Sequence, residues 1–541
     1  MQAQGDAVLD APRALPAIFV RYPRLTAIAA GAVGAFGYPP FGLWSLALLS
    51  VGLLGFLVWS AASWKRAALI GWLWGWSHLS VANNWIATAF THQGEMPAFL
   101  GWIAVPLLCV YLAIYPALAA LAAWRATRGR GASVFILAFA AAWIVTEWLR
   151  SWVFTGYPWP PLGLALLGPL DRPGWASLLP WLGTYALSGL VVLFGAWLVL
   201  FANQRRWVWL AGGSALLAAG MYLPGGNHAA EGTLRYTLVQ PDLDQAELND
   251  PRQYEPAFLT LAALSAREDD AEPRIVLWPE SGLPDYLRPG YPARYYAATT
   301  AQADPDYARQ RIGNVIGENS LLLTGAQDLR IETVDGAPKA TGAYNAVTAI
   351  NSEGELVGSY AKAHLVPYGE YLALRWLLEP LGASRLVAGT IDFIPGPGPA
   401  TQDFGRFGRV GVQICYEIVF SGQVTERGNR PDYIFNPSND GWFGYWGPPQ
   451  HLAQARMRAI EEGLPVLRST TTGISAVIDA DGVVRDHLGP GVLDRMEGFV
   501  PPAKSPTLFS RMGNALATLW ALVLIGAAYA ASSVARRRAQ S

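Results

Sequence analysis

Residues 408–418 have the sequence GRVGVQICYEI, a short apolar run that ends at Cys415 and continues into Tyr416 and Glu417. Its β-branched residues, bounded by glycine, predict a buried strand over 410–415. A turn from this strand into a helix presents the thiol beside backbone N–H groups that can stabilise an oxyanion. The stretch therefore predicts a cysteine nucleophile at a strand end, with a buried structural cysteine as the alternative.

Similar short runs follow one another through residues 224–512 and often end in Gly, Pro or Asn. Helical stretches at 255–267 and 451–462 fall between them, and Gly463 ends the second. Strands that alternate with helices predict an α/β sandwich, and the turn at 479–482 predicts a late hairpin. The expected strands are 234–240, 274–278, 320–324, 345–351, 410–415, 433–436, 466–469 and 475–479.

Two further strand ends carry ionisable groups. Glu280, in WPESGLP, is placed to act as a general base, with a strand-end cap as the alternative. Lys362, in YAKAHLVPYGEY, is placed to lower the pKa of the thiol and to stabilise an oxyanion, although a lone lysine is usually a solvated surface residue. Glu370 could hold Lys362 or assist Glu280. His364 and His451 are expected in structural hydrogen bonds, with a role as a base as the alternative.

The first 223 residues differ in composition from the rest. Overall, 52% of the 541 residues are hydrophobic and 15% are charged, which is too apolar for an ordinary soluble protein. Residues 1–223 carry twelve Lys/Arg and five Asp/Glu, against 27 and 35 in the remainder. A spanning helix needs about 20 apolar residues, which predicts about eight helices, the first and seventh marginal. They are expected at 25–40, 44–62, 67–86, 98–123, 132–150, 183–203, 207–223 and 513–533.

Positive charges set the expected orientation, because Lys and Arg stay on the cytoplasmic side of a membrane. Clusters of Lys and Arg lie in alternate loops, whereas loops 39–43, 87–97 and 151–182 contain only Arg172. Eight helices with both termini inside place the large segment outside the cytoplasm. The expected domains are an N-terminal membrane domain (1–223), a catalytic domain (224–512) and a last helix with a basic cytoplasmic tail (513–541).

Cysteine usage favours the nucleophile. The chain contains two cysteines, and Cys109 lies in an apolar run where a small buried side chain is expected. Cys415 therefore has no partner for a disulfide, although disulfides are favoured outside the cytoplasm. A lone thiol kept in such a compartment is a candidate nucleophile.

Two features lie at the edge of the membrane part. Glu147 and Arg150 are three residues apart on one helix face, and we expect an ion pair that fixes the end of that helix. The following GYPWPPLGLALLGPL (156–170) is too rich in Pro and Gly for a spanning helix. We expect a re-entrant or surface-lying loop, whose backbone must be satisfied by protein or water.

The motifs WPES, YAKAHLVPYGEY and ICYE, with SNDGWFG and QHLAQARMRAIEEGLPVLRSTTTGISAVID after them, resemble the nitrilase superfamily. Members of that superfamily use a Glu-Lys-Cys triad in an αββα sandwich. The flanking helices, together with NNWI and TEWLRSWVFTGYPW, narrow the resemblance to the apolipoprotein N-acyltransferase family of Gram-negative bacteria. The resemblance spans nearly the whole chain, and several long motifs in the same order make it specific.

This resemblance implies roles for the residues of the site. Glu280 is the expected base, Lys362 the oxyanion-stabilising lysine and Cys415 the nucleophile. The supporting positions match Glu370, Tyr416 and Glu417, and Trp442 matches an aromatic residue that lines the acyl or substrate cleft.

One position departs from the family, and one segment has two readings. The family often has a Trp-Asp pair after the first strand, whereas Asn249 precedes Asp250 here, with Tyr254 as a candidate substitute for the aromatic. The apolar segment 371–378, directly after Glu370, is expected either to form a mobile lid or to be buried in the sandwich.

The reaction implied by the resemblance has two halves. The thiolate attacks the sn-1 acyl ester of a phospholipid, with phosphatidylethanolamine as the expected donor, and forms a thioester. The α-amino group of S-diacylglyceryl-cysteine at the N-terminus of a prolipoprotein then takes the acyl chain, giving ping-pong kinetics. No cofactor, metal or nucleic acid is implied. We expect a monomer in the bacterial inner membrane, with its catalytic domain in the periplasm.

Two other functions remain open from the residues. A membrane-tethered amidase would use the same triad with water as the acceptor, and apolar segments beside the triad argue for a lipid donor instead. A non-enzymatic membrane scaffold would leave the triad unexplained, and the helices carry few of the charges that transport requires.

Overall fold

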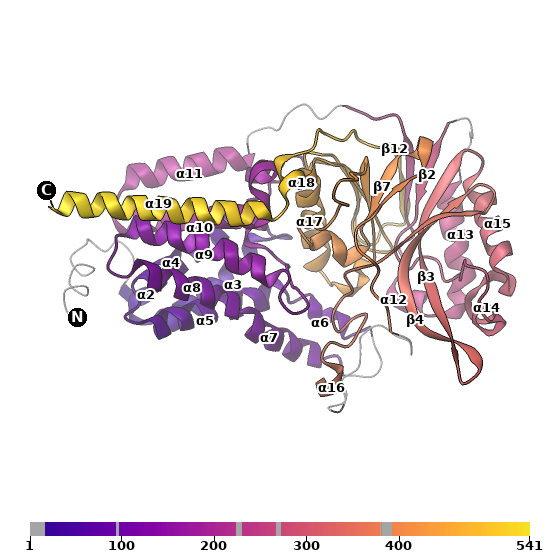
Figure 1. Ribbon diagram of the computed structural model, residues 1–541, viewed down its shortest axis with the longest axis horizontal. Coiled ribbons are helices and arrows are strands. Elements are labelled where there is room, and N and C mark those ends of the chain that lie inside the picture. The colour runs from indigo at the N-terminus through magenta and orange to yellow at the C-terminus, as the bar shows by residue number, and fades with distance from the viewer. Residues whose placement is uncertain are drawn as a thin grey trace. The chain divides into compact units, whose positions relative to one another are not determined.

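The computed structural model describes residues 17–92, 97–222, 230–266, 272–378, 380 and 392–540. Within these described residues the chain divides into two compact units (Figure 1). The described parts of 1–87, 101–226 and 507–541 form the first unit. Those of 88–100 and 227–506 form the second.

The first unit is helical, because long apolar runs satisfy their backbone groups internally as helices. Its short helices in the described residues include α2 (Ala17–Arg21) and α18 (Leu508–Met512), and α6 (Ile86–Ala89) crosses the boundary at residue 87. Its longer helices are α3 (Pro23–Gly34), α4 (Trp44–Trp59), α5 (Trp64–Ala82), α7 (Leu100–Leu112), α8 (Ile114–Thr127), α9 (Ala132–Arg150), α10 (Leu179–Asn203), α11 (Trp207–Tyr222) and α19 (Ala515–Gln540).

Each expected membrane segment overlaps a helix. In the described part of the chain, four helical stretches are long and apolar enough to cross a membrane: Leu100–Thr127, Ala132–Arg150, Trp175–Asn203 and Ala515–Val534. α4 and α11 are apolar but shorter. The number of eight spans therefore stays a prediction, whereas the helical nature of these segments is confirmed.

The end of α9 carries the expected ion pair. The carboxylate of Glu147 and the guanidinium of Arg150 are 3.7 Å apart and both are buried. Arg150 also donates to the carbonyl of Pro160 at 2.8 Å, and Glu147 accepts the N–H of Leu162 at 2.8 Å. The pair therefore holds the following loop as well as the helix end. The 3-10 helix η2 (Leu162–Leu166) of this loop is buried by protein, whereas the position of the loop relative to a membrane stays a prediction.

The second unit is an α/β sandwich that contains two six-stranded sheets within the described residues. The first has the order β12-β1-β2-β3-β4-β5, and the second has the order β11-β10-β9-β8-β7-β6. Its strands are β1 (Arg235–Gln240), β2 (Arg274–Leu277), β3 (Ser320–Val334), β4 (Ala337–Asn351), β5 (Leu356–Ala361), β6 (Thr401–Asp403), β7 (Arg409–Val412), β8 (Tyr433–Ser438), β9 (Val466–Thr470), β10 (Ser475–Ile478), β11 (Val484–Leu488) and β12 (Asp494–Phe499). β1–β2–β3 and β7–β8–β9 are parallel.

Helices cover the outer faces of both sheets (Figure 1). α13 (Tyr254–Ser265) and α15 (Pro305–Ile316) pack on the first sheet through an apolar core that includes Leu261, Val276 and Ile312. α17 (Gly447–Glu462) packs on the second. Between the sheets, Ser469 of β9 donates to the carbonyl of Val239 in β1 at 2.7 Å. This arrangement confirms the αββα sandwich. The remaining helices are α12 (Gln245–Leu248), α14 (Ala293–Thr299) and α16 (Arg375–Leu378).

All eight predicted strands are present, and the predicted late hairpin is formed by β10 and β11. The sequence does not predict β5, β6 and β12 as strands, and it predicts β11 only as the second strand of that hairpin. These four strands are the edges of the two sheets in the described chain. An edge strand is only partly buried, so it lacks the continuous apolar run that marks an interior strand.

Candidate active site

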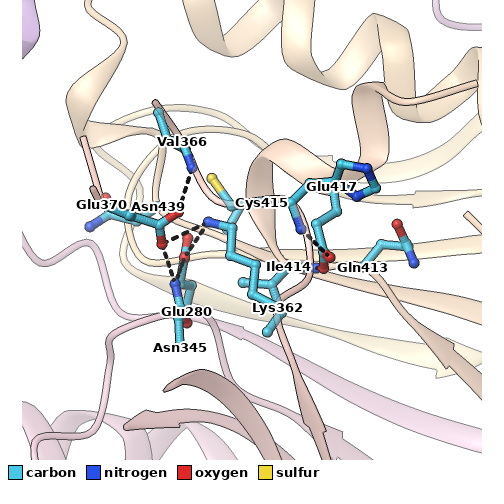
Figure 2. A network of polar contacts seen from close by, with 12 residues as sticks. Glu280, Asn345, Lys362, Val366, Glu370, Gln413, Ile414, Cys415, Glu417 and Asn439 are labelled. Carbon is cyan, nitrogen blue, oxygen red and sulfur yellow. Dashed lines mark hydrogen bonds and ion pairs between the residues drawn. The ribbon is translucent and has the colours of Figure 1, made fainter. Parts of the chain in front are cut away.

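Glu280, Lys362 and Cys415 each follow a strand. Glu280 lies after β2, Lys362 directly after β5, and Cys415 after β7. Their exposed fractions are 5%, 1% and 5%, so all three are buried. Figure 2 shows their side chains gathered with that of Glu370. The sandwich therefore brings together the three residues that the sequence predicts as a triad.

Cys415 occupies a strained turn. It begins the 3-10 helix η8 (Cys415–Val419) and has a φ of +50°, in the left-handed region that non-glycine residues rarely adopt. Such strain persists only where the surroundings fix the residue, and it is concentrated at functional sites. The backbone N–H of Asn439 donates to the sulfur. A strained, hydrogen-bonded thiol favours the nucleophile over a structural cysteine.

Glu417 ties this turn to the segment that carries Lys362. One carboxylate oxygen accepts the N–H of Ile414 at 2.8 Å (Figure 2). The other accepts the hydroxyl of Tyr360 at 2.8 Å and the N–H of Ala363 at 2.7 Å. Burial raises the pKa of Glu417 to about 7, although these hydrogen bonds act to lower it. Glu417 thus links the turn after β7 to the end of β5 through hydrogen bonds.

Lys362 is held by two carboxylates. Its Nζ lies 3.0 Å from Glu370 and 3.4 Å from Glu280. The backbone N–H of Lys362 donates to the backbone carbonyl of Asn345 at 2.8 Å. Burial alone would lower the pKa of Lys362, but Glu370 and then Glu280 raise it above its ordinary value. The lysine is therefore an ammonium in the resting site. Of the two expected roles for Glu370, holding Lys362 is the one that this geometry supports.

Asn345 completes the group and was missed from the sequence. Its amide nitrogen donates to Glu280 at 2.7 Å and to Glu370 at 2.9 Å (Figure 2). Glu370 also accepts the N–H of Val366 at 2.7 Å. An asparagine within a strand gives no local signal for this role, because the contact depends on how β4 meets the segments that follow β2 and β5.

The turn that carries Glu280 is packed tightly against β3. A Cβ added to Gly325 would lie 2.7 Å from the carbonyl oxygen of Pro279 and 2.8 Å from the Cα of Glu280, so a side chain there would displace the turn. Thr471 donates its hydroxyl to the carbonyl of Glu280. Ser281, the next residue, has a φ of +60°. The carboxylate is therefore held by a rigid backbone.

Lys362 acts to lower the pKa of the Cys415 thiol, as expected, but other effects outweigh it. Burial, followed by the Glu280 carboxylate, raises the pKa of the Cys415 thiol well above its ordinary value, although Lys362 acts to lower it. The resting group is thus a thiol, and a base must remove its proton during attack. The charge of the Glu280 carboxylate has the largest effect on the thiol pKa after burial, and this carboxylate is placed to accept the proton.

The structure also places the other residues singled out from the sequence, which are Tyr416, Trp442, Asn249 and Tyr254. Tyr416 is buried and meets Phe420 edge to face at 5.1 Å between ring centroids. Trp442 is half-buried, with its ring edge-on to His92 at 5.7 Å. Asn249 donates to the carbonyl of Gln245 at 2.9 Å, which explains its place at a helix end but shows no role in the site. Tyr254 starts α13 and is partly buried.

The segment after Glu370 is not uniformly buried. Leu372 and Ala373 are buried, whereas Leu374 and Trp376 are 53% and 75% exposed. The side chains of residues 377 and 378 lie outside the described residues. Burial of the whole segment in the sandwich is therefore wrong.

Both predicted histidines make structural contacts. His364 stacks on Phe420 at 4.2 Å between ring centroids. His451 contacts the carbonyl of Cys415 at 3.1 Å. Among the described residues, no group of three or more His, Cys, Asp and Glu side chains could hold a metal ion.

Known proteins match this chain along most of its length. A family model for the apolipoprotein N-acyltransferase N-terminal domain matches residues 30–197, and one for carbon-nitrogen hydrolases matches residues 237–491. An apolipoprotein N-acyltransferase of Rhodopseudomonas palustris is 33% identical over 525 residues, covering 92% of this chain and 93% of that protein. One from Bradyrhizobium diazoefficiens is 34% identical over 521 residues, covering 91% of each. A solved mutant amidase of the nitrilase superfamily from Nesterenkonia AN1 is 17% identical with a TM-score of 0.33, covering 51% of this chain and 94% of that one.

Proposed function

This chain belongs to the apolipoprotein N-acyltransferase family, and from that premise we propose that Glu280, Lys362 and Cys415 carry out its acyl transfer through a thioester. The protein is an acyltransferase of the nitrilase superfamily that N-acylates lipoproteins, and it is a bacterial membrane protein. What is proposed is the set of residues, the chemical route, the donor and the orientation.

In the first half-reaction, Glu280 takes the proton of the Cys415 thiol as sulfur attacks the sn-1 ester carbonyl of a phospholipid. The carbonyl oxygen becomes an oxyanion beside the Lys362 ammonium, which stabilises it electrostatically. The C–O bond then breaks, and Glu280 returns its proton to the departing oxygen. The products are a thioester on Cys415 and a lysophospholipid, so atoms and charge balance.

In the second half-reaction, the α-amino group of S-diacylglyceryl-cysteine attacks the thioester carbonyl. Glu280 takes the proton that nitrogen loses, and Lys362 again stabilises the oxyanion. The C–S bond breaks, and Glu280 returns the proton to sulfur. An amide forms and the free thiol is regenerated. The thioester conserves the acyl-transfer potential, so the route requires no ATP and predicts ping-pong kinetics.

One observation carries this assignment. The ammonium of Lys362 is paired with Glu370 at 3.0 Å as well as with Glu280 at 3.4 Å, so Glu280 is not the only carboxylate that balances its charge. A cation fixed by a second carboxylate supplies positive charge to the oxyanion without consuming the base. Glu417 and Tyr416 are proposed as supporting residues through the turn that carries Cys415, and Trp442 as a substrate-contacting aromatic.

We propose phosphatidylethanolamine as the donor and the periplasmic side of the inner membrane as the place of reaction, with the protein acting as a monomer. Clusters of Lys and Arg in alternate loops support two cytoplasmic termini, a membrane domain over 1–223, a periplasmic domain over 224–512 and a last helix with its tail over 513–541. Both substrates carry acyl chains, and exposing a chain to water costs about 0.8 kcal/mol per CH₂, so a membrane-held site avoids a large barrier.

A labelled donor tests the function. Proteoliposomes receive phosphatidylethanolamine with a deuterated sn-1 chain and a diacylated lipopeptide, and the products are weighed by mass spectrometry. We expect the label in an amide on the lipopeptide, with one lysophospholipid released per transfer. Labelled free fatty acid as the main product, with the lipopeptide unchanged, would instead establish a tethered amidase. The variant Cys415→Ser, which lacks the proposed nucleophile, is the negative control.

A further inference from the structure

A buried histidine lies directly behind the nucleophile. His451, on α17, has no exposed surface, and its Nε2 lies 3.1 Å from the backbone carbonyl oxygen of Cys415. On the other side of the ring, Nδ1 lies 2.9 Å from a guanidinium nitrogen of Arg468 and 2.9 Å from a carboxylate oxygen of Asp440. Both of those residues are also buried.

The hydrogen-bond partners of the His451 ring determine which of its two nitrogens carries the proton. A guanidinium can only donate, so Arg468 requires an unprotonated Nδ1. A carbonyl can only accept, so Cys415 requires a protonated Nε2. The opposite neutral form would donate its Nδ1–H to Asp440, but it would also set that N–H against Arg468 and a lone pair against the carbonyl of Cys415. Burial, followed by the charge of Arg468, lowers the pKa of His451, which disfavours an imidazolium.

Arg468 is itself fixed and cannot easily turn away. It lies in β9, and its guanidinium donates to both carboxylate oxygens of Asp440 at 2.7 Å and to the hydroxyl of Ser438 at 2.8 Å. One guanidinium nitrogen bridges Asp440 and His451, so the short distance between the carboxylate and Nδ1 follows from a shared donor. The salt bridge also neutralises the buried charge.

We propose that Arg468 fixes His451 as its Nε2–H form, and that this N–H, donated to the carbonyl of Cys415, holds the nucleophile in its left-handed conformation. The φ of +50° at Cys415 is unfavourable unless the surroundings hold it, and a fixed carbonyl restrains the peptide plane that follows the residue. His451 contacts the backbone of Cys415, so it is a positioning residue. The inference rests on the proposed role of Cys415.

Two amide substitutions separate this role from simple core packing. The side-chain nitrogen of Gln reaches the place of Nε2, whereas that of Asn reaches only the place of Nδ1. His451→Gln therefore keeps a donor to Cys415, and His451→Asn loses it while remaining polar and uncharged. Both variants are compared in the full-length, membrane-embedded protein.

We expect the single-turnover rate of Cys415 acylation by a phospholipid donor to fall about 100-fold in His451→Asn, as a small misplacement of a reacting group can do. The rate in His451→Gln should stay within about tenfold of wild type. The KM for the acceptor lipopeptide should be unchanged in both. Wild-type acylation in His451→Asn, or equal losses in two folded variants, would overturn the proposal.

A second measurement uses the wild-type protein, so it holds even if His451→Asn fails to fold. Cysteine labelled with ¹³C at its carbonyl and histidine labelled with ¹⁵N in its ring are incorporated, and solid-state NMR reports which ring nitrogen lies near a cysteine carbonyl. Cys415→Ser assigns the signal. A protonated nitrogen supports the proposal, and an unprotonated one overturns it. Neither result requires acyl transfer, so failure of the proposed function is recognised separately, by the absence of any acyl group on wild-type Cys415.

Discussion

The Nζ of Lys362 lies 3.0 Å from Glu370, a carboxylate outside the predicted triad. Both side chains are buried, so neither charge is screened by water. Glu280 lies farther from the same ammonium, at 3.4 Å. The Lys362 ammonium therefore lies between two carboxylates. Glu370 holds the lysine in place, and Glu280 is proposed to transfer the proton.

Glu370→Gln tests this division of duties. With Glu370 neutral, the proposed base Glu280 becomes the main counter-charge of the Lys362 ammonium, which disfavours proton uptake by Glu280. We expect kcat for lipopeptide acylation to fall about 100-fold, equivalent to about 3 kcal/mol. The matched control is Glu255→Gln, which removes an exposed ion pair with Arg311 that is worth little. Equal activity of the two variants would contradict the assigned role of Glu370.

Asn345→Ala removes the amide that donates to both Glu280 and Glu370. Two buried carboxylates would then lose a shared donor, and a buried acceptor left unsatisfied costs about 1–3 kcal/mol. We expect the initial rate of acylation to fall about 10- to 100-fold. Asn351→Ala, on the same strand, removes two side-chain hydrogen bonds with the exposed Glu355 and should leave the rate unchanged. A smaller loss at Asn345 than at Asn351 would argue against the bridging amide.

The stability of the sandwich should depend on the ionisation of Glu462. Burial, and then the neighbouring Glu461, raise the pKa of Glu462 from 4.5 to about 7. Between these values the folded protein keeps a proton that the unfolded chain releases, so stability falls as the pH rises through this window, by about 3 kcal/mol at most.

Thermal unfolding of Glu462→Gln measures this effect. The variant lacks the titrating group, so its midpoint relative to wild type should rise by a few degrees from pH 5 to pH 8. The surface variant Glu255→Gln should show no such trend. A constant difference between Glu462→Gln and wild type across this range would show that the group does not titrate as described.

The exposed residues Leu374 and Trp376 test whether the segment after Glu370 acts as a lid at the membrane surface. Their joint replacement by Ser removes apolar area that would otherwise enter the interface. We expect about tenfold slower turnover of a long-chain donor in vesicles, and unchanged turnover of a short-chain donor in solution. Leu259→Ser, at a residue 56% exposed on α13, is the control. Unchanged turnover in vesicles by a folded variant would argue against a lid.

Much of the sandwich could be predicted because its interior strands are local patterns. β2 and β7 are short apolar runs that end at polar residues, so both the strands and the residues after them, Glu280 and Cys415, are visible in the sequence. The edge strands β5, β6 and β12 were missed because partial burial leaves no continuous apolar run, and β11 was indicated only by the turn before it.

The residues that complete the site could not be predicted for a different reason. Asn345 meets Glu280 and Glu370 only after β2, β3, β4 and β5 have assembled in one sheet. The contact of His451 with the Cys415 turn likewise depends on how α17 packs on the second sheet. Burial also reverses the expected effect on the thiol, because desolvation outweighs the charge of Lys362.

The most direct test of the account is the mass of the protein after incubation with phosphatidylethanolamine and no acceptor. We predict an acyl group on the peptide that contains Cys415, removable by neutral hydroxylamine, absent from Cys415→Ser, and discharged by a diacylated lipopeptide. Folded protein that acylates the lipopeptide without ever carrying an acyl group on Cys415 would contradict the account.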